Sequence, residues 1–259
     1  MTTFYEKLGF HDGGVITLVG AGGKTTLMFR LAHELSQTDG PVLTTTTTKI
    51  YLPKPEESET VIILDPLQDM APRCRDVLKH THHVTAAAGY QKSQNKLTGF
   101  SSEDVQNLWE TGLFKWILVE ADGAAHRSLK APASYEPVIP ACTRWLVTLV
   151  GMDAIGKPLD EQWVFRSQLY SRITGLLPGD TVTEDSVVKA ILHDQGLMKG
   201  CPAGANRYVF FNKADDDLSR HSGRRAAALL CSAAKKKLDA VFIGSAQGDA
   251  QQTEYMGIQ

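Results

Sequence analysis

The feature that most constrains the fold is an apolar run that passes through a glycine-rich loop into a helical pattern. Residues 15–19 (VITLV) are apolar or β-branched and are bounded by glycines on both sides, which is typical of a strand buried on both faces. From Lys24 onward, Leu27, Leu31 and Leu35 recur at a spacing of four and therefore share one face of a helix. A buried strand, a tight loop and a helix in this order indicate the first half of a βαβ unit.

Strands and helices alternate along the rest of the chain, which predicts an α/β fold with a doubly wound, mostly parallel sheet of the P-loop NTPase type. The second strand is expected to lie next to the first. We expect a single domain over residues 1–259, in which residues 151–205 form a helical insertion or subdomain. The remaining expected strands are 42–47, 61–64, 116–120, 145–150, 208–211 and 240–244, and the remaining helices are 70–79, 103–110, 185–192 and 218–237.

Composition limits the partners. The 27 basic and 29 acidic residues give a net charge of −2, so there is no global positive field that would attract nucleic acid or an anionic membrane. The four cysteines form no CxxC pair, which argues against a zinc site and a disulfide framework. Because no stretch approaches the roughly 18 apolar residues of a membrane span, we expect a cytoplasmic protein, and a homodimer is compatible with the sequence.

The loop between the first strand and helix has the composition of a phosphate-binding loop. Glycines allow backbone N–H groups to approach phosphate oxygens, and the helix N-terminus favours negative charge. Lys24 would neutralise the β- and γ-phosphates, and Thr25 would offer its hydroxyl to Mg²⁺. The pattern GxxxxGK[ST] has a glycine where this chain has Leu18, so the loop is two residues short and resembles that of the Mur ligases, which bind ATP. The candidate phosphate-binding residues are Gly20, Ala21, Gly22, Gly23, Lys24, Thr25 and Thr26.

Two carboxylates follow the apolar strand at 116–120. In an open parallel sheet, ligands bind beyond the carboxyl ends of the strands, so Glu120 and Asp122 should face the glycine-rich loop. One of them would hold Mg²⁺ and one would orient the attacking water, which together with Lys24 makes three candidate catalytic residues. The spacing Glu-x-x-Gly, ending at Gly123, resembles the third motif of metal-chaperone GTPases. The next residues include His126, Arg127 and Lys130, which are candidates for contact with phosphate or an anionic second substrate.

A base-recognition motif follows the expected strand at 208–211. Asn212, Lys213 and Asp215 fit the NKxD motif of GTPases, in which the aspartate accepts hydrogen bonds from guanine and the lysine stem packs on the base. The next strand ends in Ser245 and Ala246, which resemble the last GTPase motif, and a right-handed crossover would bring the two motifs together. Guanine is therefore favoured over adenine, although the short Mur-like loop favours ATP.

A run of threonines, Thr44 to Thr48, ends the second strand. Threonine favours strands, so most of these residues are expected to be structural. A hydroxyl at this edge, with Thr46 as the candidate, would complete the Mg²⁺ shell as a switch threonine does.

With these motifs in place, the chain resembles the YqeC family, described as accessory proteins of selenium-dependent molybdenum hydroxylases. The resemblance lies in the segments VGAGGKTT, LTTTTTKI, LVEADGAAHRSLKAP and NKAD, at residues 19–26, 43–50, 118–132 and 212–215. It implies a cytosolic maturation factor that helps to insert or prepare a molybdenum centre, with its labile selenium. The implied partners are a molybdenum hydroxylase client or its cofactor-handling proteins.

Three functions compete at this point. The first is a Mg²⁺-dependent GTPase or ATPase that serves in maturation. The second is a Mur-ligase-like or kinase-like transferase that uses ATP on a small substrate. The third is a module that binds nucleotide or molybdopterin without hydrolysis.

Overall fold

A nine-stranded sheet forms the centre of the protein, whose computed structural model describes residues 2–63, 70–234 and 237–257. The strands are β1 (Gly14–Gly20), β2 (Val42–Thr46), β4 (Val61–Ile63), β5 (His83–Ala87), β8 (Trp116–Glu120), β10 (Thr143–Gly151), β12 (Asn206–Asn212), β13 (Ala240–Ile243) and β14 (Glu254–Gly257). Their order is β14-β13-β12-β10-β1-β8-β2-β5-β4, and all neighbours pair in parallel except β13 and β14.

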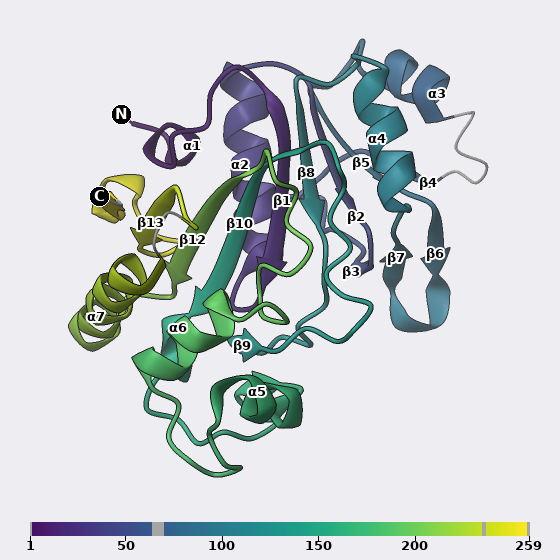
Figure 1. Ribbon diagram of the computed structural model, residues 1–259. Coiled ribbons are helices and arrows are strands. Elements are labelled where there is room, and N and C mark those ends of the chain that lie inside the picture. Colours follow the sequence, from purple (N-terminus) through teal and green to yellow (C-terminus); the bar gives the residue numbers. More distant parts are fainter. Residues whose placement is uncertain (1, 64–69, 235–236, 258–259) are drawn as a thin grey trace.

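Helices cover both faces of the sheet (Figure 1). The helices of the described ranges are α1 (Phe4–Lys7), α2 (Lys24–Thr38), α3 (Met70–Val77), α4 (Ser102–Glu110), α5 (Ser167–Thr174), α6 (Glu184–Leu192) and α7 (Asp217–Ala234), with 3-10 turns at Lys92–Gln94, Met152–Ala154 and Ala250–Gln252. On one face, Leu27 and Leu31 of α2 share a core with Ile16 and Leu118 of the sheet. The opposite face is covered by α3 and α4 over one half and by α6 and α7 over the other. The predicted α/β, doubly wound and mostly parallel architecture is confirmed.

Two small sheets stand at the carboxyl ends of the central strands, as does α5 (Figure 1). One is antiparallel, with the order β3-β7-β6, and consists of β3 (Lys49–Tyr51), β6 (Gly89–Gln91) and β7 (Lys96–Thr98). The other pairs β9 (Leu129–Lys130) with β11 (Val164–Phe165) in parallel. These additions lie at the edge where open α/β sheets generally bind their ligands.

The expected position of the second strand is wrong. β8, not β2, lies beside β1, and β2 pairs with the other edge of β8, so that Leu118 is opposite Ile16 on one side and Thr44 on the other. The apolar β8 is fully buried between its neighbours, whereas Thr44 and Thr45 of β2 direct their hydroxyls toward β5, the next strand out. Thr44 Oγ1 lies 2.7 Å from Thr85 Oγ1, and Thr45 Oγ1 donates to the Ala86 carbonyl.

The predicted elements match the observed ones to within a few residues, except that Leu64 and residues 235–236 of the predicted strand and helix lie outside the described residues. The sequence-based prediction missed several elements: β3, β5, β9, β11, β14, α1, α5 and the β6–β7 hairpin. Residues 151–205 contain the pair α5 and α6, which pack on each other, and α6 also packs on α7. The division of the chain into a domain and a subdomain stays a prediction.

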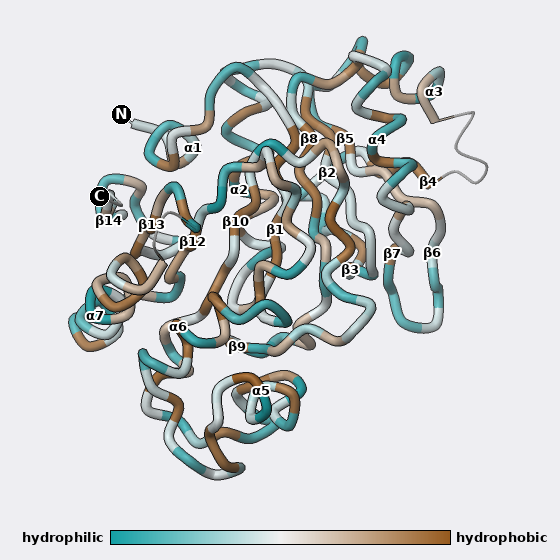
Figure 2. Tube along the Cα trace, in the orientation of Figure 1, coloured by the Kyte–Doolittle hydropathy of each residue, from teal (hydrophilic) through white to brown (hydrophobic). Residues whose placement is uncertain are grey.

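Hydrophobic residues concentrate in the central strands, and the tip of the β6–β7 hairpin is hydrophilic (Figure 2). Of the helices in the described ranges, none is both long enough and apolar enough to cross a bilayer. The four cysteines are free thiols.

Candidate functional site

The glycine-rich loop is a tight turn that joins β1 to α2. Gly20 and Gly23 have φ angles of 90° and 116°, in the left-handed region that side chains disfavour. A Cβ atom at Gly20 would lie 2.3 Å from the Leu149 carbonyl oxygen, and one at Gly23 would lie 2.4 Å from Asn212 Nδ2. Both space and backbone conformation therefore require glycine at these two positions.

The amides of the loop divide into two groups. The N–H groups of Gly20, Ala21 and Gly22 donate within the protein, to Asp122 Oδ2 (3.1 Å), the Leu149 carbonyl (2.9 Å) and the Arg127 carbonyl (3.1 Å). The next four amides, of residues 23–26, have no acceptor in the described part of the chain. The sequence-based prediction counted every residue from Gly20 to Thr26 as a phosphate contact, and this stays a prediction. The amides of residues 23–26, at the N-terminus of α2, are the ones without an acceptor among the described residues, and amides in this position are typical anion donors.

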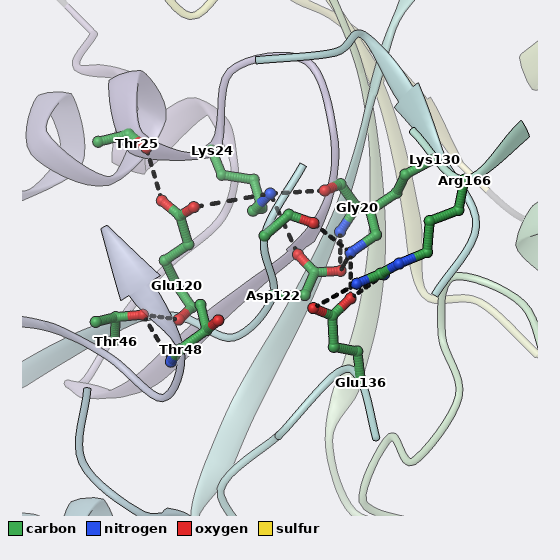
Figure 3. A network of polar contacts seen from close by, with 11 residues as sticks. Gly20, Lys24, Thr25, Thr46, Thr48, Glu120, Asp122, Lys130, Glu136 and Arg166 are labelled. Atoms are coloured by element: carbon green, nitrogen blue, oxygen red, sulfur yellow. Dashed lines mark hydrogen bonds and ion pairs between the residues drawn. The ribbon is translucent and has the colours of Figure 1, made fainter. Parts of the chain in front are cut away.

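Lys24, the first residue of α2, is buried and lies among acceptors (Figure 3). Its Nζ donates to the Gly20 carbonyl (2.6 Å) and lies 3.2 Å from Asp122 Oδ1 and 3.8 Å from Glu120 Oε1. Burial alone would lower the pKa of Lys24, but the negative charges of Asp122 and Glu120 outweigh it and raise the pKa. Lys24 therefore stays protonated and provides a positive charge beside the loop.

Thr25 and Glu120 form a hydroxyl–carboxylate pair across the site. Thr25 Oγ1 donates to Glu120 Oε2 at 2.7 Å. Burial raises the pKa of Glu120, an effect that the nearby Lys24 and the Thr25 hydrogen bond only partly offset. A divalent cation placed between these two oxygens would compensate the buried carboxylate.

The side-chain oxygens of Thr25 and Glu120 are donors of the kind that Mg²⁺ prefers. Within the described ranges there is no group of three or more His, Cys, Asp or Glu side chains that could hold a metal. Mg²⁺ is usually held by one or two protein oxygens together with phosphate oxygens and water. Glu120 and Thr25 supply two such oxygens next to the free amides of α2.

Thr46 lies beside the backbone of Glu120 (Figure 3). Its hydroxyl donates to the Glu120 carbonyl (2.6 Å) and accepts from the Thr48 amide (3.0 Å). Thr47 donates its hydroxyl to the Val138 carbonyl. Thr46 therefore holds the end of β8 against β2, and its predicted role as a metal ligand stays a prediction.

Asn212, the last residue of β12, joins the glycine-rich loop to the loop that follows β13. Its Nδ2 donates to the Gly22 carbonyl (2.6 Å), and its Oδ1 accepts from the Ala246 amide (2.7 Å). The side chain is buried, so these two bonds fix the distance between the two loops. The structure thus brings together the two segments that the sequence assigned to base recognition.

The rest of the NKxD segment lies beside this junction. Lys213 has a left-handed backbone (φ 58°), and its Nζ donates to Ser128 Oγ (2.7 Å) and to Asp153 Oδ2 (2.9 Å). Asp215 is exposed, and Ser245 is partly exposed. Asp215 is accessible to a ligand, whereas Lys213 is already held by its two partners.

Three charged residues behind the loop form an extension of the site. Lys130, which the sequence placed among possible phosphate contacts, is instead completely buried against Asp122 Oδ2 (2.9 Å) and Glu136 Oε2 (2.8 Å). Arg166 in turn holds both carboxylate oxygens of Glu136. Nothing in the sequence points to Glu136 or Arg166, because each is a single charge in a segment without a motif.

His126 and Arg127 point away from the loop amides. The His126 ring stacks on Tyr51 with the ring centroids 5.2 Å apart, and the Arg127 side chain donates to the carbonyls of Glu161 and Ala125. The backbone carbonyl of Arg127, in contrast, accepts a hydrogen bond from the Gly22 amide of the glycine-rich loop.

Comparison with known proteins adds a family to this geometry. A family model described as "YqeC protein" matches residues 16–168, a span that includes the glycine-rich loop, the acidic strand end and Arg166. The chain is also 33% identical over 205 residues to a protein of Escherichia coli strain K12 named "Uncharacterized protein YqeC". That alignment covers 77% of this chain and 75% of the E. coli protein.

Proposed function

Because this chain belongs to the YqeC family, we propose that it is a Mg²⁺-dependent nucleoside triphosphatase that favours GTP over ATP. It would act in the cytoplasm as an accessory factor in the maturation of a selenium-dependent molybdenum hydroxylase. The nucleotide part of this proposal depends on the geometry of the site. The assignment of the client protein depends on what the family resemblance implies.

One observation carries the nucleotide part: the four amides of residues 23–26 lie between the acidic end of β8 and the segment that begins at Asn212, and both contact the glycine-rich loop or the helix start that follows it. On one side, Thr25 is bonded to Glu120. On the other side, Asn212 bonds the Gly22 carbonyl and the Ala246 amide. This arrangement supports phosphates at the N-terminus of α2, a cation beside Glu120, and a base near Asp215.

In this proposal, each residue of the site has a distinct role in hydrolysis. The amides of residues 23–26 bind the β- and γ-phosphate oxygens, and the Lys24 ammonium neutralises charge that develops on them. Glu120 and Thr25 hold Mg²⁺, which, when bound, neutralises phosphate charge and orients the triphosphate. Asp122 has both oxygens facing groups of the protein, which favours a role in organising the loop over a role in orienting water.

Guanine preference would come from Asp215, whose exposed carboxylate can accept hydrogen bonds from N1–H and from the exocyclic amine. Adenine offers no such pair of donors. The short glycine-rich loop remains the feature that favours ATP.

The test is a titration of the purified protein with non-hydrolysable GTP and ATP analogues, with and without Mg²⁺. Asp215→Ala should reduce the preference for GTP by about tenfold or more, since two charge-assisted hydrogen bonds are lost. Asp217→Ala removes an exposed acid two residues further along and serves as the matched control. An unchanged preference in Asp215→Ala would rule out the guanine assignment.

Phosphate release then separates the competing functions. A maturation NTPase should hydrolyse slowly alone and faster with its client. Stoichiometric consumption of ATP with a small acceptor would instead indicate a ligase or kinase. Tight binding without phosphate release, even with client present, would indicate a binding module.

A further inference from the structure

A buried chain of alternating charges leads from the glycine-rich loop to α5 (Figure 3). It runs from Lys24 to Asp122, then to Lys130, Glu136 and finally Arg166, the residue before α5. The first four of these side chains are almost fully buried, and each contacts its neighbours directly. Charges at this depth are stable only when they are paired.

Asp122 is the carboxylate that two lysines, Lys24 and Lys130, share. Its Oδ2 forms an ion pair with Lys130 Nζ (2.9 Å) and accepts a hydrogen bond from the Gly20 amide (3.1 Å), while its Oδ1 faces Lys24 Nζ at 3.2 Å. With Glu120 included, the cluster contains three cations and three carboxylates and is electrically balanced.

Binding of a triphosphate would disturb this balance at one residue. Lys24 is the cation nearest to the free amides, and to reach a phosphate its Nζ must leave Asp122. A buried carboxylate that loses its cation is strongly unfavourable, so the cost would be subtracted from the affinity for the triphosphate. Asp122 avoids this cost only if a second cation stays beside it.

We propose that Lys130 is that second cation and is a positioning residue for the triphosphate site. It keeps Asp122 paired when Lys24 turns toward phosphate. On its other side the Lys130 ammonium donates to Glu136, which Arg166 holds in place, so Lys130 does not follow Lys24 out of the network. The proposal deepens the proposed function and depends on triphosphate binding at the loop.

The proposal distinguishes two roles for the same contacts. If Lys130 only fastens β9 to its surroundings, its loss should reduce stability and affinity whatever residue stands at position 122. If it releases Lys24, its loss should weaken binding only while position 122 carries a charge. A double-mutant cycle between the two positions separates these roles.

The experiment measures binding of fluorescent non-hydrolysable GTP and ATP analogues, with Mg²⁺, to full-length protein. Lys130→Met is compared with the parent, and the double variant Lys130→Met with Asp122→Asn is compared with Asp122→Asn alone. We expect Lys130→Met to weaken binding by about tenfold or more when Asp122 is present, and by less than about threefold in the Asp122→Asn background. The same cycle with Lys130→Gln, which keeps a donor amide without the charge, covers the case in which the methionine variant does not fold.

The control is Lys199→Met, which removes a lysine that donates to the nearby Ala133 carbonyl but touches neither acid of the loop. Its effect on affinity should be the same in both backgrounds at position 122. An equal loss of affinity for Lys130→Met and Lys130→Gln in both backgrounds, or no loss in either, would overturn the role of Lys130. A parent protein that binds neither analogue would instead refute the proposed function itself, so the two failures are distinguishable.

Discussion

The side chain of Asn212 makes the sharpest stability prediction, because it is the only described side chain that bonds both the glycine-rich loop and the loop after β13. Asn212→Ala would leave the Gly22 carbonyl and the Ala246 amide without partners in a buried position. Each unsatisfied group costs about 1 to 3 kcal/mol, which gives a loss of about 2 to 6 kcal/mol in the free energy of unfolding. In a chain of this size, the melting temperature should fall by roughly 5 to 15 °C.

Thermal unfolding followed by circular dichroism measures this change. Asn206→Ala is the matched control, because Asn206 is half-buried and its side chain makes one longer bond, 3.2 Å to the Arg144 carbonyl. Its cost should be about 1 kcal/mol or less. If Asn212→Ala melts no lower than Asn206→Ala, the two loops are not held together by this side chain, and the reasoning about the base site loses its structural support.

Two further predictions concern the phosphate side of the site and the far edge of the sheet. Thr25→Val removes the hydroxyl beside Glu120 and should weaken Mg²⁺-dependent binding of GTP analogues by about 10- to 100-fold. Thr38→Val, at the end of the same helix, is the control and should leave this binding unchanged. If titration calorimetry finds the same Mg²⁺ dependence in both variants, the Thr25 hydroxyl is not a Mg²⁺ ligand. Burial lowers the pKa of His83 to about 4, below its ordinary value of 6.5, so the unfolded chain binds a proton that the folded protein resists and stability falls as the pH drops through this window. In the parent protein, protonation of His83 should lower the free energy of unfolding by at most about 3 kcal/mol between pH 6.5 and 4, and His83→Gln should abolish this decrease. Urea unfolding curves with the same pH dependence in the parent and the variant would contradict this.

Much of this fold could be predicted from the sequence because its strong signals are local. β1 and β8 are continuous apolar runs, and the periodicity of α2 and α7 is long enough to identify helices. Elements with weak local signals were missed. β5, for instance, reads HVTAA and gains its stability from pairing with β2 and β4 on either side.

The strand order and the buried charges lie beyond local patterns. β8 separates β1 from β2 because an apolar strand buried on both faces is most stable in the middle of the sheet, and a sequence pattern does not rank strands in this way. Motif spacing predicted that Glu120 and Asp122 would face the loop, and they do contact Lys24. It did not predict Glu136 or Arg166, whose pairing is formed only by the folded path of the chain between β8 and α5.

The most direct test of the central claim is a crystal structure of the protein with Mg²⁺ and a non-hydrolysable GTP analogue. We predict that the β- and γ-phosphates contact the amides of residues 23–26, that Lys24 Nζ has moved from Asp122 to a phosphate oxygen, and that Asp122 keeps Lys130. Phosphates bound elsewhere, with the Lys24 ammonium still beside Asp122 and the amides of α2 unused, would contradict the account.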